Sequence, residues 1–323
     1  MNLAEIWTMG ETLVEIMRTK EDTPLNETAL FSGPYPSGSS AIMISTVARL
    51  GHSCGIISGV GDDEFGECML NRLKKDGVDV SKVLVDPDGS TACAFVAYDS
   101  DGDRKYLFHW DHTPATAAKM PDVTEPGLKE AKYLHVMGCA LTAKLEYGWE
   151  IVKTARAMKE QGTKISFDPN VRVEHLKSPA RSKQAYEIIN AILEITSLFA
   201  PGLDELKLLT GIDDVEEAVK KCFENPNLEI LMLKMGSKGS RIYTRDGKVV
   251  EQGLYKVESV DPTGAGDTSV GTFLCGLLEE KSIEECARMA AAAGALNVAA
   301  FGPMEGDISP ESVQAMMDGT YKF

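Results

Sequence analysis

Basic residues are scarce in this sequence of 323 residues. Lysine and arginine together number 33 against 49 aspartates and glutamates, which gives a formal net charge of −16 and a pI near 4.8. A surface of this charge repels nucleic-acid phosphates and acidic lipid headgroups, and no basic run offsets it. We therefore expect no nucleic-acid and no membrane partner. Any anionic ligand would have to be held locally, by backbone amides and a few placed cations.

Long hydrophobic runs are also missing. No stretch approaches the ~18–20 apolar residues of a membrane helix, and the first residues lack the basic and apolar regions of a secretory signal. The seven cysteines are scattered and form no C-x-x-C pair, so a structural zinc site has no support and reduced core thiols are expected. Together these absences predict a cytoplasmic protein.

What the sequence does contain is an alternation of short apolar runs with longer amphipathic ones. We expect strands at 133–138, 164–168, 197–200 and 230–235, and helices at 145–161, 179–193 and 204–210. In the first of these helices, Leu145, Trp149, Val152 and Ala155 should share one face. Strand–helix–strand repetition predicts a parallel sheet with helices on both faces, whose ligands lie at the carboxyl ends of the strands.

Two segments depart from the strand–helix alternation, because the strand-like runs at 6–18 and 91–110 contain no intervening helix. Asp101-Gly102 would supply the turn of a hairpin in the second run. A small sheet of these strands could form a lid or a dimer surface; the alternative is an edge extension of the main sheet. We predict one α/β domain over 1–323, a Rossmann-like sandwich with a mostly parallel central sheet and a small projecting β-sheet lid formed by about 11–36 and 91–112.

The stretch V-D-P-T-G-A-G-D-T-S-V-G-T-F (260–273) combines small residues that leave the backbone accessible, the predicted start of a helix, and a carboxylate. Amides of Gly264, Ala265 and Gly266 in the first turn of a helix would form an anion hole. A carboxylate beside it, Asp267, could take a proton from an attacking hydroxyl, which suits phosphoryl transfer. The alternative is a glycine-rich turn in which the aspartate caps the helix. The chain has no Walker A motif and no early G-x-G-x-x-G, so a dinucleotide-binding oxidoreductase is disfavoured.

The same stretch resembles the C-terminal signature of the ribokinase-like carbohydrate kinases, often called the PfkB family. Further landmarks match in order: M-G-E-T-L-V-E (9–15), G-V-G-D-D-E-F-G (59–66), D-G-V-D (76–79), F-D-P-N-V-R (167–172), P-G-L-D-E-L-K-L-L-T-G (201–211) and K-M-G-S-K-G (234–239). The resemblance implies phosphorylation of a sugar hydroxyl with ATP and Mg²⁺, with K⁺ in some members, and a homodimer formed through the lid.

By position, the resemblance assigns roles to individual residues. Asp267 is the base, and Gly264, Ala265 and Gly266 form the anion hole. The nucleotide-binding residues it implies are Lys234, Gly236, Gly239, Thr263, Gly264, Gly266 and Asn297. Glu205 would help to hold Mg²⁺ through water, and Asp261 with the loop at 300–302 resembles a monovalent-cation site.

The expected sugar-binding residues are Glu11, Glu15, Gly38, Ser39, Arg104, Asp168, Asn170 and Arg172. Glu11 and Glu15 have the same parity on the first strand and should face one side, although a solvent-facing alternation is the alternative. Gly38 would allow close approach of a ligand, or is simply a loop residue. Arg104 and Arg172 could reach a substrate, or form ordinary surface ion pairs.

Three positions depart from the family pattern. Ser37 stands where the family has a glycine, and Ile42 falls where an asparagine that touches the sugar is expected. Gly202 replaces the asparagine of an N-x-x-E motif, whose carboxylate is kept by Glu205; Asp168 and Asn170 could compensate. The leading hypothesis is a kinase of a ketohexose such as tagatose or fructose. A 2-keto-3-deoxygluconate kinase, a nucleoside or vitamin kinase of the same superfamily, and a non-catalytic sensor of sugar or nucleotide with the kinase fold remain alternatives.

Overall fold

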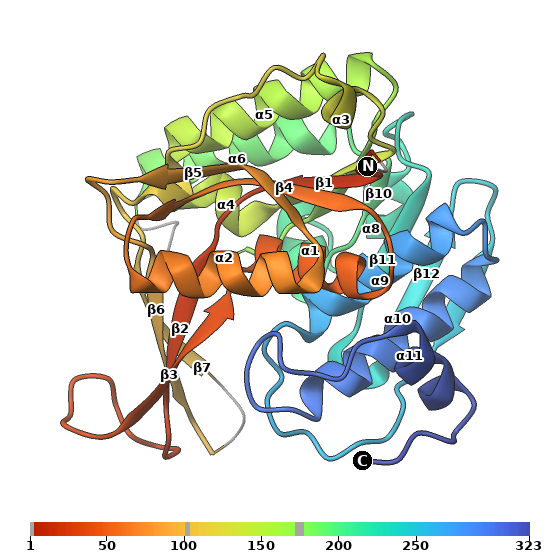
Figure 1. Cartoon of the computed structure of the whole chain (residues 1–323). Coiled ribbons are helices and arrows are strands. Elements are labelled where there is room, and N and C mark those ends of the chain that lie inside the picture. Colours follow the sequence, from red (N-terminus) through yellow and green to blue (C-terminus); the bar gives the residue numbers. More distant parts are fainter. Residues whose placement is uncertain (1–2, 101–103, 172–177) are drawn as a thin grey trace.

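A nine-stranded sheet lies at the centre of the molecule in the computed structural model, which describes residues 3–100, 104–171 and 178–323 (Figure 1). Across the sheet the strands are β13 (Val249–Gln252), β12 (Ser240–Thr244), β11 (Ile230–Lys234), β10 (Leu198–Phe199), β9 (Lys164–Asp168), β8 (Tyr133–Met137), β1 (Ile6–Met9), β4 (Cys54–Gly61) and β5 (Asp79–Asp86). All pairs from β11 to β5 are parallel, and β12 and β13 are antiparallel. The predicted mostly parallel sheet is thus confirmed.

Helices cover both faces of this sheet, because its strands are apolar on both sides. In β1, for example, Ile6 belongs to one core and the next residue, Trp7, to the other. The first core is closed by α1 (Ser39–Arg49), α2 (Glu64–Asp76), α9 (Ala265–Leu278), α10 (Ile283–Val298) and α11 (Pro310–Met317). The second is closed by α3 (Pro126–Lys129), α4 (Gly138–Ala143), α5 (Leu145–Glu160), α6 (Pro179–Leu193), α7 (Leu203–Thr210) and α8 (Val215–Cys222). Figure 1 shows the two layers on opposite sides of the strands.

A second, smaller sheet stands away from the first, and we refer to it as the lid (Figure 1). Its order is β3 (Phe31–Ser37), β2 (Leu13–Arg18), β6 (Cys93–Tyr98) and β7 (Arg104–His109). Because these strands pair only with one another among the described residues, the alternative of an edge extension of the main sheet is wrong. The proposed turn at Asp101-Gly102 lies outside the described residues, but the strands that flank it pair as an antiparallel hairpin.

Most predicted elements agree with the structure to within one or two residues, and two details do not. Trp149 is 39% exposed, so it does not share the buried face of α5. Val152 and Ala155 are buried as predicted, and helical rotation places Gly148 and Ile151 beside them. Glu11 was expected on the first strand, but it lies in the turn between β1 and β2. The chain must leave the main sheet at this point to enter the lid. No helix in the described part of the chain is long and apolar enough to cross a membrane.

His135 in β8 is a fully buried titratable side chain in the middle of the main sheet. Its Nδ1 lies 2.9 Å from the hydroxyl of Ser166 on the neighbouring strand β9. Its Nε2 has no hydrogen-bond partner among the described residues. Burial, assisted by the positive charge of Lys234, lowers the pKa of His135 from 6.5 to about 3. The imidazole is therefore neutral in the folded protein.

This burial predicts a pH dependence of stability. Between pH 6.5 and about 3, His135 takes up a proton in the unfolded chain but not in the folded protein. Protonation therefore favours the unfolded chain, so the folded protein is fully stable with respect to His135 above pH 6.5 and loses stability as the pH falls. The expected slope is up to about 1.4 kcal/mol of unfolding free energy per pH unit. Urea unfolding at pH 7, 6 and 5 should show a shallower decline for His135→Asn than for the wild type. The exposed control His112→Asn should follow the wild type, and equal slopes in all three proteins would contradict the prediction.

Candidate active site

A cavity of about 180 Å³ lies between the carboxyl ends of the central strands and the lid. Its walls come from the turn after β1, the start of α1, the end of β11, the start of α9, and one face of the lid strands β2 and β7. These segments are far apart in the sequence and meet only in the folded chain. The position agrees with the expected ligand site of a parallel sheet.

One end of the cavity is the start of α9. Gly264 is the N-cap of this helix and has a left-handed conformation with φ of 80°. A Cβ at this position would lie 2.7 Å from the carbonyl oxygen of Pro303, so a side chain is excluded by space as well as by conformation. Asp267 is the third residue of the helix and lines the cavity. The alternative in which this aspartate caps the helix is therefore wrong.

A lysine approaches the same helix start from the main sheet. Lys234, at the end of β11, forms an ion pair with Asp168, whose side chain is only 1% exposed. The lysine Nζ lies 3.7 Å from the position that a Cβ on Gly266 would occupy. Burial lowers the pKa of Lys234, but the carboxylates of Asp168 and Glu205 raise it by more, and the net shift is upward. A permanent positive charge therefore lies beside the first turn of α9.

Glu205 is held in place by the backbone that surrounds it. Its two carboxylate oxygens accept hydrogen bonds from the amides of Gly202 and Val171, at 2.7 Å each. Burial and the nearby carboxylate of Asp168 raise the pKa of Glu205, although Lys234 and the two amides act in the opposite direction. The carboxylate of Glu205 is thus held in place although Gly202 stands where the family has an asparagine. The negative charges of Glu205 and Asp168 together favour a bound cation.

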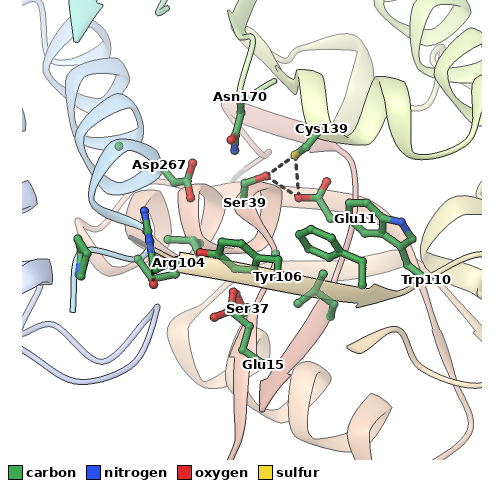
Figure 2. A pocket seen from close by; sticks show the side chains of 18 of the residues that line it. Glu11, Glu15, Ser37, Ser39, Arg104, Tyr106, Trp110, Cys139, Asn170 and Asp267 are labelled. Carbon is green, nitrogen blue, oxygen red and sulfur yellow. Dashed lines mark hydrogen bonds between the residues drawn. The ribbon is translucent and has the colours of Figure 1, made fainter. Parts of the chain in front are cut away.

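The opposite end of the cavity is built around Glu11, which is 2% exposed (Figure 2). Its Oε1 accepts hydrogen bonds from the hydroxyl of Ser39, at 2.5 Å, and the thiol of Cys139, at 3.3 Å. Its Oε2 accepts one from Ser40 at 3.2 Å. Gly38, the N-cap of α1 with φ of 102°, allows this approach, because a Cβ there would lie 2.7 Å from the carbonyl oxygen of Glu11.

A second buried carboxylate, Glu15, faces the cavity from β2. The hydroxyl of Ser37 donates a hydrogen bond of 2.7 Å to Glu15. Ser37 was noted in the sequence only as a departure from the family pattern, and Cys139 was not proposed at all. No local signal marks either residue, because each reaches its glutamate across segments separated in the chain.

Tyr106, Phe108 and Trp110 form an aromatic wall on the lid side of the cavity. Figure 2 shows Tyr106 and Trp110 of this wall. The rings of Tyr106 and Phe108 stack with centroids 5.4 Å apart, and those of Phe108 and Trp110 with centroids 4.4 Å apart. Sequence analysis missed these three residues as site residues. Their i, i+2, i+4 spacing on a strand was the available signal, since it puts them on one face of the lid.

The structure brings together most of the predicted site residues. Those that line the cavity are Glu11, Glu15, Gly38, Ser39, Arg104, Asn170, Glu205, Lys234, Thr263, Gly264, Gly266 and Asp267. Ala265 is the first residue of α9, between two of them, and Asp168 lies beneath the cavity as the partner of Lys234. Gly236 and Gly239 are at the turn after β11, outside the cavity wall. Arg172 lies outside the described residues.

Asn297 and Asp261 face the protein interior rather than the cavity. Asn297 is 1% exposed, and its amide group donates a 2.7 Å hydrogen bond to the carbonyl oxygen of Thr263. Asp261 is fully buried, and its carboxylate accepts hydrogen bonds from the amides of Thr263 and Gly302 and from the hydroxyl of Tyr98. Both side chains therefore hold the loop that leads into α9.

Comparison with known proteins identifies the family. The sequence pattern of the pfkB family of carbohydrate kinases matches residues 4–310. The chain belongs to this family. Fructokinase-1 of Oryza sativa subsp. japonica is 32% identical over 305 residues, and fructokinase-1 of Zea mays is 32% identical over 307; each match covers 91% of both chains. Crystal structures of a candidate ribokinase II from E. coli, an apo form and a complex with ATP and Mg²⁺, are 34% identical, with a TM-score of 0.89 over 98% of this chain and 100% of theirs.

These similarities confirm the resemblance seen in the sequence and the predicted fold class. The protein is a carbohydrate kinase, an enzyme that transfers a phosphoryl group to a sugar hydroxyl. In this carbohydrate kinase the buried ion pair of Lys234 and Asp168 joins two central strands, β11 and β9, directly beneath the cavity.

We expect that removing one charge of this ion pair destabilises the protein more than removing both. Lys234→Met would leave the buried carboxylate of Asp168 without its cation and should cost about 3 kcal/mol of unfolding free energy. The double variant Lys234→Met/Asp168→Asn should recover most of that loss, because the unpaired charge is gone. Urea unfolding of the wild type and the single and double variants measures the coupling. Lys248→Met, which breaks the exposed pair with Glu284, is the control and should cost at most about 1 kcal/mol. Additive losses in the double variant would contradict this interpretation.

Proposed function

We propose that this carbohydrate kinase transfers the γ-phosphoryl group of ATP to a hydroxyl of a neutral ketohexose, such as fructose or tagatose. The observation that carries the proposal is a single cavity with two chemically different ends. One end has the start of α9 with Asp267, and the other has the buried carboxylates of Glu11 and Glu15. Carboxylates accept hydrogen bonds from sugar hydroxyls, while helix amides hold phosphate. The fructokinase relatives support a hexose as the substrate.

The mechanism follows from the order of groups along the cavity. A primary hydroxyl of the sugar, held by Glu11 and Glu15, would point towards Asp267, which takes its proton as the hydroxyl oxygen attacks the γ-phosphorus in line. The bond to the leaving oxygen of ADP breaks on the opposite side. The amides of Gly264, Ala265 and Gly266 stabilise the charge on the transferred group. Lys234, charged and adjacent to Gly266, adds a positive charge at the same place.

Residues around the helix start would also bind the nucleotide. Thr263, Gly264 and Gly266 line the cavity where the phosphates would lie, and we place the rest of ATP along the turn that contains Gly236 and Gly239. A Cβ on Gly236 would meet no atom within 4 Å, so the turn is open at this residue, whereas Gly239 packs closely against the backbone of Gln252. Asn297 would contribute indirectly, by holding Thr263.

The carboxylates near the phosphate end suit Mg²⁺, which prefers oxygen ligands and usually keeps several waters. Glu205 would hold the ion through water, with Asp168 and Asn170 nearby. Bound there, Mg²⁺ would neutralise charge on the ATP phosphates. The fit rests on the oxygen-bearing side chains of Glu205 and Asn170, which both line the cavity. Burial and the nearby charge of Asp168 raise the pKa of Glu205, and a cation there would relieve both effects. A monovalent cation at Asp261 stays a prediction, as does a cytoplasmic location.

The charge of the sugar distinguishes a neutral ketohexose, the leading substrate, from 2-keto-3-deoxygluconate, which carries a carboxylate. The carboxylate of 2-keto-3-deoxygluconate would enter a cavity that already contains Glu11 and Glu15, where like charges repel. The observation in its favour is Arg104, which lines the same cavity from β7 and could pair with an acid group. Since this arginine lies at the phosphate end, beside Thr263, we rank the neutral ketohexose first.

Purified protein with Mg-ATP should release ADP in the presence of fructose or tagatose. The rate should be at least about tenfold higher than with 2-keto-3-deoxygluconate, because a unit of mispaired charge costs more than about 1.4 kcal/mol. Ribose and adenosine are neutral and differ from a ketohexose in size and shape, so they test the fit of the cavity and should also react more slowly. Asp267→Asn keeps the shape but cannot accept the proton, and should lower kcat by about 10²–10⁴.

The matched control is Asp214→Asn, which removes a carboxylate from the exposed cap of α8 and should keep full kcat. Preference for the acid sugar would overturn the neutral-ketohexose proposal. Ligand-induced melting shifts with no turnover in any protein would instead support a binding protein that has lost catalysis.

We also propose that the enzyme forms a homodimer through the outer face of the lid. Residues alternate along the lid strands, so the face opposite the cavity carries Phe31, Phe95, Leu107 and His109. Leu107 is 48% exposed and Phe31 38%, and Phe95 packs edge-on against the rings of Phe31 and His109. A contiguous apolar patch of this kind favours binding of a protein partner. In a two-fold symmetric dimer, the same patch on a second copy of the chain would cover it.

Light scattering coupled to size exclusion should give the mass of a dimer for the wild type and of a monomer for Leu107→Glu, because a buried charge in the centre of an interface is strongly unfavourable. Leu254→Glu, at a position 55% exposed outside the lid, is the control and should stay dimeric. A monomeric wild type, or a dimeric Leu107→Glu, would exclude the lid interface.

A further inference from the structure

The lid contacts the loop that precedes α9 at two places. The hydroxyl of Tyr98, at the end of β6, donates a hydrogen bond of 3.2 Å to the carboxylate of Asp261. Arg104, at the start of β7, donates one of 3.0 Å to the hydroxyl of Thr263. Gly264, which begins the anion hole, is the next residue. The lid that covers the sugar cavity is therefore bonded directly to the segment that shapes the phosphate end.

Asp261 is the centre of this contact. One oxygen accepts from the amide of Thr263 at 2.9 Å, and the other accepts from the amide of Gly302 at 3.1 Å as well as from Tyr98. The side chain is fully buried, and hydrogen bonds to a buried carboxylate are stronger than those between neutral groups. Burial and the charge of Asp261 raise the pKa of Tyr98, so its hydroxyl stays a donor.

The body of the protein holds the same loop from the other side. Asn297 of α10 donates to the carbonyl oxygen of Thr263 at 2.7 Å, and the hydroxyl of Thr268 in α9 donates to Asn297 at 3.3 Å. The loop is thus clamped between two rigid helices and the lid. Of these contacts, only those from Tyr98 and Arg104 can open when the lid moves.

We propose that Tyr98 and Asp261 form a latch that positions the anion hole, so that the phosphate end has its final shape only while the lid lies over the sugar. Tyr98 is a positioning residue in this scheme, since it acts through Asp261 and does not touch the reacting atoms. The proposal rests on the placement of phosphoryl transfer at the start of α9. It also gives the buried carboxylate of Asp261 a role that needs no monovalent cation.

Tyr98→Phe tests the latch, because it removes one hydroxyl and keeps the ring beside Phe301. Tyr35→Phe is the matched control. Tyr35 packs against the same Phe301, with ring centroids 5.7 Å apart, but the hydrogen bond of its hydroxyl lies within the lid, 2.7 Å from Ser32. Tyr98→Phe should lower kcat about tenfold, the effect of one hydrogen bond to a charged group, with KM for the sugar unchanged within about twofold. Tyr35→Phe should match the wild type.

The ratio of ADP formed to sugar phosphate formed gives a second readout. A lid that is not latched admits water to the phosphate, so the ratio should rise above that of the wild type only in Tyr98→Phe. A loss of general stability would lower both products together and leave the ratio unchanged. Equal kcat values and equal ratios in the two variants would overturn the latch.

Hydrogen exchange tests the same contact without any turnover. The amides of Thr263 and Gly302 both donate to Asp261, so their exchange rates report how firmly that carboxylate is held. Both should exchange about tenfold faster in Tyr98→Phe than in Tyr35→Phe. Unchanged exchange at both amides would overturn the latch even if no sugar is turned over, whereas faster exchange with no turnover would retain the latch and reject the proposed substrate.

Discussion

The left-handed backbone at Gly264 is the constraint on which the site depends. The chain turns here beside the carbonyl oxygen of Pro303, and α9 starts at the cavity, where we propose that its first amides bind phosphate. A helix start is one of the few ways in which a chain with net charge −16 can bind an anion, because the amides carry partial positive charge without requiring many basic side chains. Lys234 supplements them with a single ammonium that Asp168 and Glu205 keep protonated.

The distribution of charge separates the two ends of the cavity. The proposed sugar end has two carboxylates, each fixed by neighbouring hydroxyls or a thiol. The proposed phosphate end has backbone amides, Lys234 and Arg104, together with the carboxylates of Glu205 and Asp267. A ligand with hydroxyls at one end and a phosphate at the other experiences favourable interactions along its whole length only in one orientation. In the proposed function, the cavity would thus determine which part of the substrate lies next to Asp267.

Sequence predicts the parts of this site that lie within one continuous segment. The anion hole and Asp267 could be found because the glycines, the helix start and the carboxylate are adjacent in the chain. The strands and most helices could be found from their periodicity. Cys139 and Ser37 could not, since each acts on a glutamate more than twenty residues away in sequence. Asp261 and Asn297 were located in the right segments, but position in a motif does not give the direction of a side chain, and both point inward.

The lid shows how one small sheet can serve several roles. Its strands alternate with a period of two, so one face presents Glu15 and the aromatic wall to the cavity while the other exposes Leu107 and its apolar neighbours. The end of the sheet, at Tyr98 and Arg104, is hydrogen-bonded to the loop before α9. If the proposed latch operates, a movement of the lid would change three things at once: the covering of the cavity, the shape of the anion hole, and the orientation of the exposed face. Coupling of this kind would need no long pathway, because the strands that line the cavity belong to the same small sheet as Tyr98 and Arg104.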